Sequence, residues 1–235
     1  MQLSSSYAEA VQYQELTAEG LNLLGEALAA VSLVADSLKF DGSVTLQAQG
    51  QGKISKLVAE CHGGHFIRGL ATHNEQVNSS EGESVGISLI AGNQLAISLL
   101  PKSYTQMQPY QGIVELKKEG LAESLSSYFK SSEQLLTSFV LTCLNGKSAG
   151  LLLQKLPTSE DTNSPNDDFD DTWNTLNILA GTVTHDELTS LPAPEVVRRL
   201  FHEHQYRIFE PKEIKFGCRC SSDKSQDAII LIGFK

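Results

Sequence analysis

The sequence predicts an α+β fold, in which a strand-rich core with long helices is followed by a helical linker and a short cysteine-containing tail. Three observations predict it. One long segment repeats its apolar residues with the period of a helix, and several short segments after it alternate apolar and polar residues as strands do. The composition then changes sharply at Pro157, where the apolar patterns give way to an acidic stretch.

The first element is a long amphipathic helix between residues 15 and 38. Its apolar residues, among them Leu24, Leu28 and Val31, recur with steps of three and four. The turn at residues 39–42 ends this helix, and Val44, Leu46 and Ala48 then alternate with polar residues. That alternation indicates the first strand of the core.

Further strands follow, each bounded by glycine or polar turn residues. They are expected at residues 54–60, 66–72, 94–99, 112–116, 137–143 and 149–156. A second helix is expected at residues 121–130. Strands grouped together, with helices to either side, favour an α+β arrangement over regular βαβ alternation.

The acidic stretch divides the chain. Six acidic residues and no basic one lie between Glu160 and Asp171, which predicts a mobile linker because little apolar surface there can offset the entropy of ordering. Helical patterns resume at residues 173–179, 187–191 and 194–202. We therefore expect a core at 1–157, a linker that is first acidic and then helical at 158–212, and a cysteine-containing segment at 213–235.

Charge and hydropathy exclude several classes of partner. The formal net charge is −10, and no cluster of Lys and Arg offers a nucleic-acid surface. The longest apolar stretch, near residues 144–156, is interrupted by polar residues, so no membrane span is expected. The first residues lack the basic and apolar regions of a signal peptide. A cytoplasmic protein is the expectation.

The four cysteines, Cys61, Cys143, Cys218 and Cys220, are too few and too unevenly placed for a disulfide framework. Cys218 and Cys220, one residue apart, can point to the same side of an extended strand and share a zinc ion. Two thiolates fill only half of a tetrahedral site, so two separate thiols in a tail are the alternative.

Two other histidine-containing patterns are better explained without a metal. Cys61 to His65 encloses Gly63-Gly64, a hairpin turn signal between two strands. His202 and His204 are two residues apart on an apparent helix end, so they point to different faces. The acidic run at 167–171 lacks the spacing of a calcium loop, and neither a nucleophile elbow nor a phosphate loop is present. We therefore expect no enzyme active site.

Several segments together resemble the redox-regulated heat-shock chaperones of 33 kDa, the holdase family also called the 33 kDa chaperonin. The similarity extends over almost all of residues 20–228. It rests on Leu38 to Gly42, Arg68-Gly69 with Ala71, Tyr110 to Val114, Tyr128-Phe129, Ser132 to Leu135, Asp168 to Asp170, Leu191 to Ala193, Glu195-Val196, Arg199-Leu200, His202-Glu203, and Phe216 with Cys218 to Ser221.

The resemblance implies an α+β substrate-binding core, a helical linker folded over it, and a C-terminal zinc unit with a Cys-x-Cys and a later Cys-x-x-Cys. It implies a chaperone of the heat-shock and oxidative-stress response that holds unfolding client proteins without ATP. In such proteins oxidation forms disulfide bonds, releases zinc and unfolds the linker. Cys218 and Cys220 are the redox and zinc residues by this comparison, and Trp173, Leu176 and Leu200 are candidate client-binding residues, with packing of linker on core as their alternative role.

Two departures from the family pattern modify these expectations. The Cys-x-x-Cys pair is not found after Cys220, so we expect a C-terminally shortened member that binds zinc weakly or not at all and responds little to oxidant. The strand-bearing segment ahead of the long helix also looks absent or replaced before Glu15. A homodimer, with segments exchanged between protomers, is a further expectation. The alternatives are a small thiol-disulfide redox protein using Cys218 and Cys220, and an inactive remnant that dimerises.

Overall fold

The computed structural model describes residues 1–38, 40–77, 86–103, 108–156 and 166–218, together with residues 226 and 230. Two sheets form the core. The larger has the strand order β6-β5-β2-β3-β4-β9, and the smaller has the order β1-β8-β7. The strands are β1 Gln2–Leu3, β2 Gly42–Gln49, β3 Ile54–His62, β4 Phe66–His73, β5 Gln94–Pro101, β6 Tyr110–Glu115, β7 Thr137–Leu144, β8 Lys147–Gln154 and β9 Lys215–Phe216.

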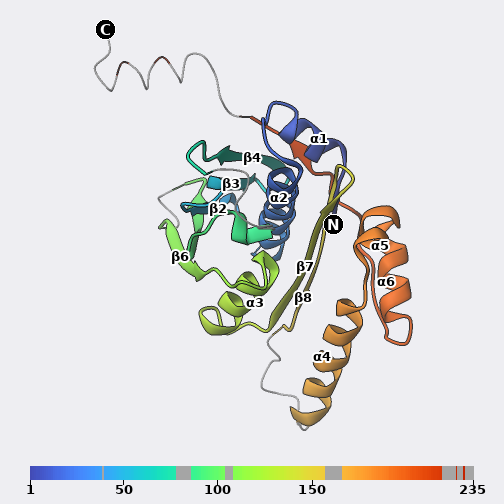
Figure 1. Cartoon of the computed structure of the whole chain (residues 1–235). Helices are drawn as coiled ribbons and strands as arrows, with labels where there is room; N and C mark the ends of the chain where they lie inside the picture. The colour runs from blue at the N-terminus through green and yellow to red at the C-terminus, as the bar shows by residue number, and fades with distance from the viewer. Residues whose placement is uncertain are drawn as a thin grey trace.

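Helix α2, Ala18–Leu38, lies between the two sheets (Figure 1). Its apolar residues face β3 and β4 on one side and β7 and β8 on the other, so Leu24, Ala27, Leu28 and Val31 have no exposed surface. Small residues let the sheets approach closely. At Gly25 a β-carbon would lie 2.4 Å from the Cys143 sulfur, so a larger residue there would collide with β7. The predicted long helix is therefore confirmed, and it is the centre of the core.

By length and composition α2 is also apolar enough to cross a membrane. No continuous apolar run marks it in the sequence, because Glu19, Glu26 and Asp36 interrupt the apolar pattern. In the structure 61% of its most apolar window is buried inside the protein, as expected of a core helix. Composition alone is thus weak grounds for a membrane span here.

The segment ahead of α2 is not without a strand, contrary to our expectation. β1 pairs antiparallel with β8, with Gln2 opposite Ala149 and Leu3 opposite Ser148. Helix α1, Ser5–Val11, follows, and its Tyr7 donates a hydrogen bond to the Leu21 carbonyl of α2 over 3.1 Å. A two-residue strand has too short an alternation to be read from sequence, and its partner strand alone defines it.

The remaining elements largely follow the predicted pattern. Helix α3, Leu121–Ser131, covers one end of the core, and a short 3-10 helix at Gly86–Leu89, which the sequence did not indicate, packs against α2. The β3–β4 hairpin turns at Gly63 and Gly64, which have φ of 57° and 71°. These left-handed conformations are the ones that a Gly-Gly hairpin turn requires, and they confirm the turn assigned to this pair.

Three helices follow the core: α4 Asn166–Gly181, α5 His185–Ser190 and α6 Ala193–Phe201. Figure 1 shows α5 and α6 on the side of the β7–β8 hairpin that faces away from α2. Residues 166–171 are helical and belong to α4, where the sequence predicted a mobile linker. The rest of the acidic stretch lies outside the described residues.

Side chains of β7 and β8 point alternately to the two faces of the small sheet, so the sheet can pack against the main core on one face and against other helices on the opposite face. Phe139, Leu141 and Cys143 belong to the main core, whereas Val140 packs on the outer side with Leu151 of β8. Because successive side chains of a strand point to opposite faces, the outer set is left to be covered by another element. Helices α5 and α6 cover it.

Candidate functional site

The first part of the candidate site is the contact between α5–α6 and the outer face of the small sheet, which we call the dock. Its buried members are Ala149 of β8, Leu188 of α5 and Val196 of α6. Val140, Leu151, Val183, Leu191 and Leu200 pack around them and remain partly exposed. The dock is therefore a small apolar contact, separate from the main core.

Helix α5 is also held at both ends by polar contacts with the core. At its start, His185 Nδ1 lies 2.7 Å from the hydroxyl oxygen of Thr142 on β7. At its end, the Gln2 side chain on β1 donates from Nε2 to the carbonyls of Leu188 at 2.9 Å and Leu191 at 2.5 Å. Gln2, Thr142 and His185 were missed from the sequence, because each contact joins residues that are far apart along the chain.

The start of α5 is well defined by local sequence. Thr184 accepts a hydrogen bond from the Glu187 backbone N–H, and the Glu187 carboxylate accepts one from the Thr184 backbone N–H. This reciprocal pair is a capping box, which satisfies backbone donors that a helix otherwise leaves unpaired. The same hydrogen bonds lower the pKa of the Glu187 carboxyl. The helix can thus form without a large apolar contact.

Helix α6 has a charged outer face. Glu195 accepts hydrogen bonds from Arg198 at 2.8 and 2.9 Å and from Arg199 at 2.8 Å. These contacts lower the pKa of the Glu195 carboxyl to about 2. Arg199 also lies 3.6 Å from Glu187, which joins α6 to α5. All of these groups are solvated, so they orient the two helices more than they stabilise them.

A cavity of about 310 Å³ lies beside the dock, between α2, β7 and α5. Glu26, Cys143 and His185 are among its lining residues. Burial raises the pKa of the Glu26 carboxyl to about 7, and burial also raises the pKa of the Cys143 thiol. The docked position of α5 therefore encloses an acidic group of the core.

The predicted client-binding residues do not form one surface. Trp173 and Leu176 on α4 are half-buried, and Leu200 packs at the edge of the dock. Larger exposed apolar side chains lie elsewhere, at Ile178 and Phe209. Phe209 belongs to an extended segment after α6, and the Arg207 guanidinium lies 5.0 Å from the centre of its ring.

The second part of the candidate site is the thiol segment, which follows β9. Strand β9 pairs in parallel with β4, and two further bonds extend the pairing: Lys215 N–H donates to the His65 carbonyl and Gly217 N–H to the Ile67 carbonyl. The exposed Cys218 comes directly after this strand. Cys220 and Arg219 lie outside the described residues. Lys215 of β9, three residues before Cys218, pairs with Glu213 at 3.0 Å.

The other two cysteines belong to the core. Cys61 on β3 has no exposed surface, and burial raises the pKa of its thiol to about 12. The neighbouring histidines are used locally: His62 Nδ1 lies 2.9 Å from Ser43 Oγ, and His65 Nδ1 lies 2.6 Å from the Gly63 carbonyl oxygen. Among the described residues no three His, Cys, Asp or Glu side chains are grouped to hold a metal ion.

Comparison with known proteins places this arrangement in a family. The sequence model of the Hsp33 protein family matches residues 1–235. The chain belongs to the Hsp33 family. Among curated relatives, the 33 kDa chaperonin of Pseudomonas fluorescens (strain SBW25) is 37% identical over 233 residues, which cover 99% of this chain and 75% of that protein. The 33 kDa chaperonin of Neisseria meningitidis serogroup A is 36% identical, with coverage of 99% and 74%.

The fold is also that of a solved Hsp33. The crystal structure of the 33 kDa chaperonin from Thermotoga maritima superposes with a TM-score of 0.78 at 22% identity, covering 97% of this chain and 78% of that one. This likeness confirms a mixed fold of helices and sheets. The family consists of chaperones, so the predicted chaperone class and the prediction of a non-enzymatic protein are both confirmed.

Proposed function

We propose that this Hsp33 protein is an ATP-independent holdase with weak redox regulation, which binds unfolding proteins under oxidative or heat stress and prevents their aggregation. The observation that carries the proposal is the dock. Among the described residues, the apolar cluster that joins α5 and α6 to the small sheet has three buried members, Ala149, Leu188 and Val196, and α6 buries Phe201 in addition. Because so little surface holds the helices down, they can leave the sheet without unfolding the main core.

Release of α5 and α6 would expose two apolar surfaces at once. One is the strip of Val140, Ala149 and Leu151 on the sheet, and the other is the inner stripe of the helices themselves, with Leu188 and Val196. An unfolding client offers apolar segments that match both. Exposed apolar patches of this kind are the usual sites of association between proteins.

We infer that the thiol segment has a weak influence on this release, through the chain between α6 and β9. Residues 202–214 run without further helix or strand from the end of α6 to β9, and Lys212 pairs with Asp36 at the end of α2. Oxidation of Cys218 and Cys220 to a disulfide releases two protons and transfers two electrons to an oxidant such as hydrogen peroxide. A disulfide at this pair would disturb the neighbouring short pairing of β9 with β4. Through residues 202–214 it would then disturb the position of α6.

The donor set fits a closed zinc site only in part. Cys218 and Cys220 supply two thiolates, half of a tetrahedral site, while Cys61 and Cys143 are buried in the core. We therefore expect zinc to bind this pair weakly and the chaperone activity to depend little on oxidant. Metal binding, where it occurs, would stabilise the segment that it holds, since the binding free energy adds to that of folding.

The expected setting and partners follow from the same proposal. We expect unfolded client proteins as partners in the bacterial cytoplasm, and neither nucleic acid nor membrane. A homodimer, in which protomers exchange segments, is part of the proposal. Analytical ultracentrifugation of the reduced and oxidised protein tests the dimer directly.

Light scattering of a chemically unfolded client tests the holdase function. The client is diluted into buffer with this protein, once reduced with zinc and once oxidised without zinc. We expect suppression of aggregation in both conditions, at about one protein per client. Suppression only after oxidation would mean that Cys218 and Cys220 form a working switch, and suppression in neither condition would refute the holdase.

The dock itself is tested with Leu188→Asp, which places a charge in the apolar contact, and Asn174→Asp as a charge-matched control on the exposed face of α4. We expect Leu188→Asp to raise client protection above that of the natural protein while the main core stays folded. Equal protection by the natural protein and both variants would show that the dock does not limit client binding.

A further inference from the structure

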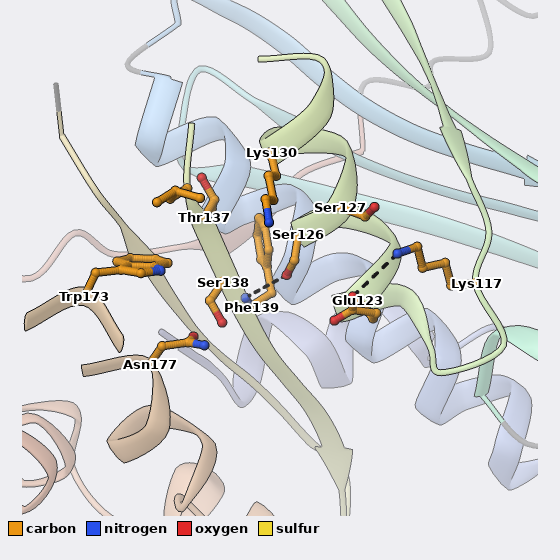
Figure 2. Close-up of a pocket in the computed structure, with 11 residues that line it drawn as sticks. Lys117, Glu123, Ser126, Ser127, Lys130, Thr137, Ser138, Phe139, Trp173 and Asn177 are labelled. Atoms are coloured by element: carbon orange, nitrogen blue, oxygen red, sulfur yellow. Dashed lines mark hydrogen bonds and ion pairs between the residues drawn. The ribbon is translucent and has the colours of Figure 1, made fainter. Parts of the chain in front are cut away.

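A second cavity lies where α4 meets the core, and the function proposed above does not use it. Its volume is about 360 Å³, and α3, β7 and α4 all contribute to its lining. Figure 2 shows Lys130 of α3 directed into this space, with Ser138 of β7 beneath it and Trp173 and Asn177 of α4 on the opposite side. The cavity therefore spans the boundary between the core and the first of the three C-terminal helices.

Hydrogen-bond donors dominate the part of the lining that has no protein partner. Within the described residues, neither a hydrogen bond nor an ion pair is made by the side chains of Ser127, Lys130, Ser138, Trp173 or Asn177. An ammonium group and an indole N–H can only donate, and hydroxyl and amide groups can donate as well as accept. A ligand that accepts several hydrogen bonds matches this set.

Two hydroxyls of the same cavity are already used, and they support the wall of the cavity. Ser126 donates to the Ala122 carbonyl at 2.8 Å and accepts from the Phe139 N–H at 3.2 Å. Thr137 donates to the Leu135 carbonyl and accepts from Gln154 Nε2 at 3.1 Å. The Ser126–Phe139 bond joins α3 to β7 and the Gln154–Thr137 bond joins β8 to β7, so Ser127, Lys130 and Ser138 are carried by elements that are bonded to one another.

The charge of the cavity is opposite to that of the chain. Lys117 lies 3.6 Å from Glu123, and these two lining residues balance each other. Lys130 is then left as a positive charge, in a protein whose formal net charge is −10. An anion that entered the cavity would meet an ammonium group together with four neutral side chains able to donate.

We propose that this cavity binds an oxyanion, either inorganic phosphate or the phosphate group of a small phosphate ester, between Lys130 of α3 and Trp173 and Asn177 of α4. A phosphate oxygen accepts hydrogen bonds from ammonium, hydroxyl, amide and indole N–H groups alike. The ligand would touch both the core and α4, so it binds fully only when α4 is docked. By linkage, it stabilises the docked position of α4 in proportion to its saturation.

The position of Trp173 provides a direct measurement, because it is the only tryptophan of the chain. Its fluorescence is recorded while inorganic phosphate, or a small alkyl phosphate ester, is added to the full-length protein at constant ionic strength. We expect a saturable change for the ligand that the site takes, and no change with sodium chloride. Tighter binding of the ester than of inorganic phosphate would identify esters as the source of the oxyanion.

Matched lysine variants locate the site. Lys130→Gln should weaken binding at least about tenfold, since it removes the charge-assisted hydrogen bond that is worth most among these contacts. Lys147→Gln, in the exposed β7–β8 turn away from the cavity, should bind as the natural protein does. A signal that does not saturate, or equal affinities for the two variants, would overturn the proposal.

Hydrogen exchange tests the coupling to α4. With saturating phosphate, amide exchange in α4 should slow in the natural protein and stay unchanged in Lys130→Gln. Saturable binding without any slowing would show that the anion does not hold α4 in place, and would overturn that part of the proposal. Neither experiment measures client protection, so their outcome is separate from that of the holdase proposal.

Discussion

Helix α2 and the pair α5–α6 both lie against the small sheet, on its two opposite faces, but they are held in very different ways. Leu28 of α2 has no exposed surface and belongs to a continuous core that includes both sheets. Leu188 of α5 is almost as buried, at 4% exposure, yet its apolar cluster has just two other buried members among the described residues, Ala149 and Val196. Burial of one residue therefore says little about how much of the protein depends on it.

One chain can therefore combine a stable core with two surface helices, α5 and α6, that are free to leave it. Free energies of local opening range from near zero up to that of global unfolding, and regions with few buried apolar contacts open first. By this criterion α5 and α6 can leave while α2 stays. Substitutions on either face of the small sheet test this difference, and those in the main core should cost the most stability.

The same substitution on the two faces should have unequal global effects. Leu28→Ala leaves a cavity in the main core and should lower the free energy of unfolding by about 3–5 kcal/mol. Leu188→Ala should lower it by about 2 kcal/mol or less, because the loss cannot exceed the free energy that docks α5 and α6. Urea unfolding followed by far-UV circular dichroism measures both.

Hydrogen exchange distinguishes the two variants further. Leu188→Ala should speed exchange in α5 and α6 alone, whereas Leu28→Ala should speed it throughout the core. Equal global losses for the two variants would contradict the separation of dock and core.

Glu26 of α2 lines the cavity that α5 also lines, so the ionisation of its carboxyl affects both regions. Burial raises the pKa of its carboxyl to about 7 in the folded protein, above its ordinary value, so the folded state holds a proton that the unfolded state has lost. Stability from this group therefore falls as pH rises from about 4.5 to about 7, and the ionised form costs up to about 3 kcal/mol above that range. Glu26→Gln removes this cost.

We accordingly expect Glu26→Gln to be more stable than the natural protein at pH 8, and the advantage to disappear near pH 5. Thermal unfolding at several pH values measures this difference. Glu19→Gln serves as a control, because Glu19 lines the same cavity but is exposed. An advantage of Glu26→Gln that did not change with pH would show that the carboxyl is ionised throughout.

The smallest effect is expected at the start of α5. Thr184→Ala removes the side-chain half of the capping box and should weaken the helix by about 1 kcal/mol, or about fivefold in the rate of hydrogen exchange within α5. The exposed Thr175→Ala on α4 is the matched control. No change in α5 exchange would show that the contacts of Gln2 and His185 hold the helix without its cap.

Most of the secondary structure could be predicted because it follows from patterns among neighbouring residues. The three- and four-residue steps of α2, the alternation of β2 to β8 and the Gly63-Gly64 turn are all properties of neighbouring residues. Strands β1 and β9 were missed because two residues carry no periodicity. They exist only where β8 and β4 offer a free edge to pair with.

The candidate site was only partly predictable. Cys218 and Cys220 are recognisable from the spacing of two residues, whereas the dock depends on which outward residues of β7 and β8 meet α5. Trp173, a client-binding candidate from the sequence, lines the cavity between α4 and the core, which the sequence did not indicate. Its neighbours in that cavity, Lys130 and Ser138, lie more than thirty residues away in the chain, so no local pattern connects them.

The class of fold, the family and the order of most helices and strands follow from the sequence alone, since each depends on short-range periodicity or on motifs in a fixed order. The covering of the small sheet on both faces, by α2 on one and by α5 and α6 on the other, becomes visible in the folded structure and not in the sequence. The folded structure also shows that Gln2, Thr142 and His185 hold α5 in place. The physical reason is that side chains from distant segments meet only after the strands have paired, and their contact energies have no counterpart in the local sequence.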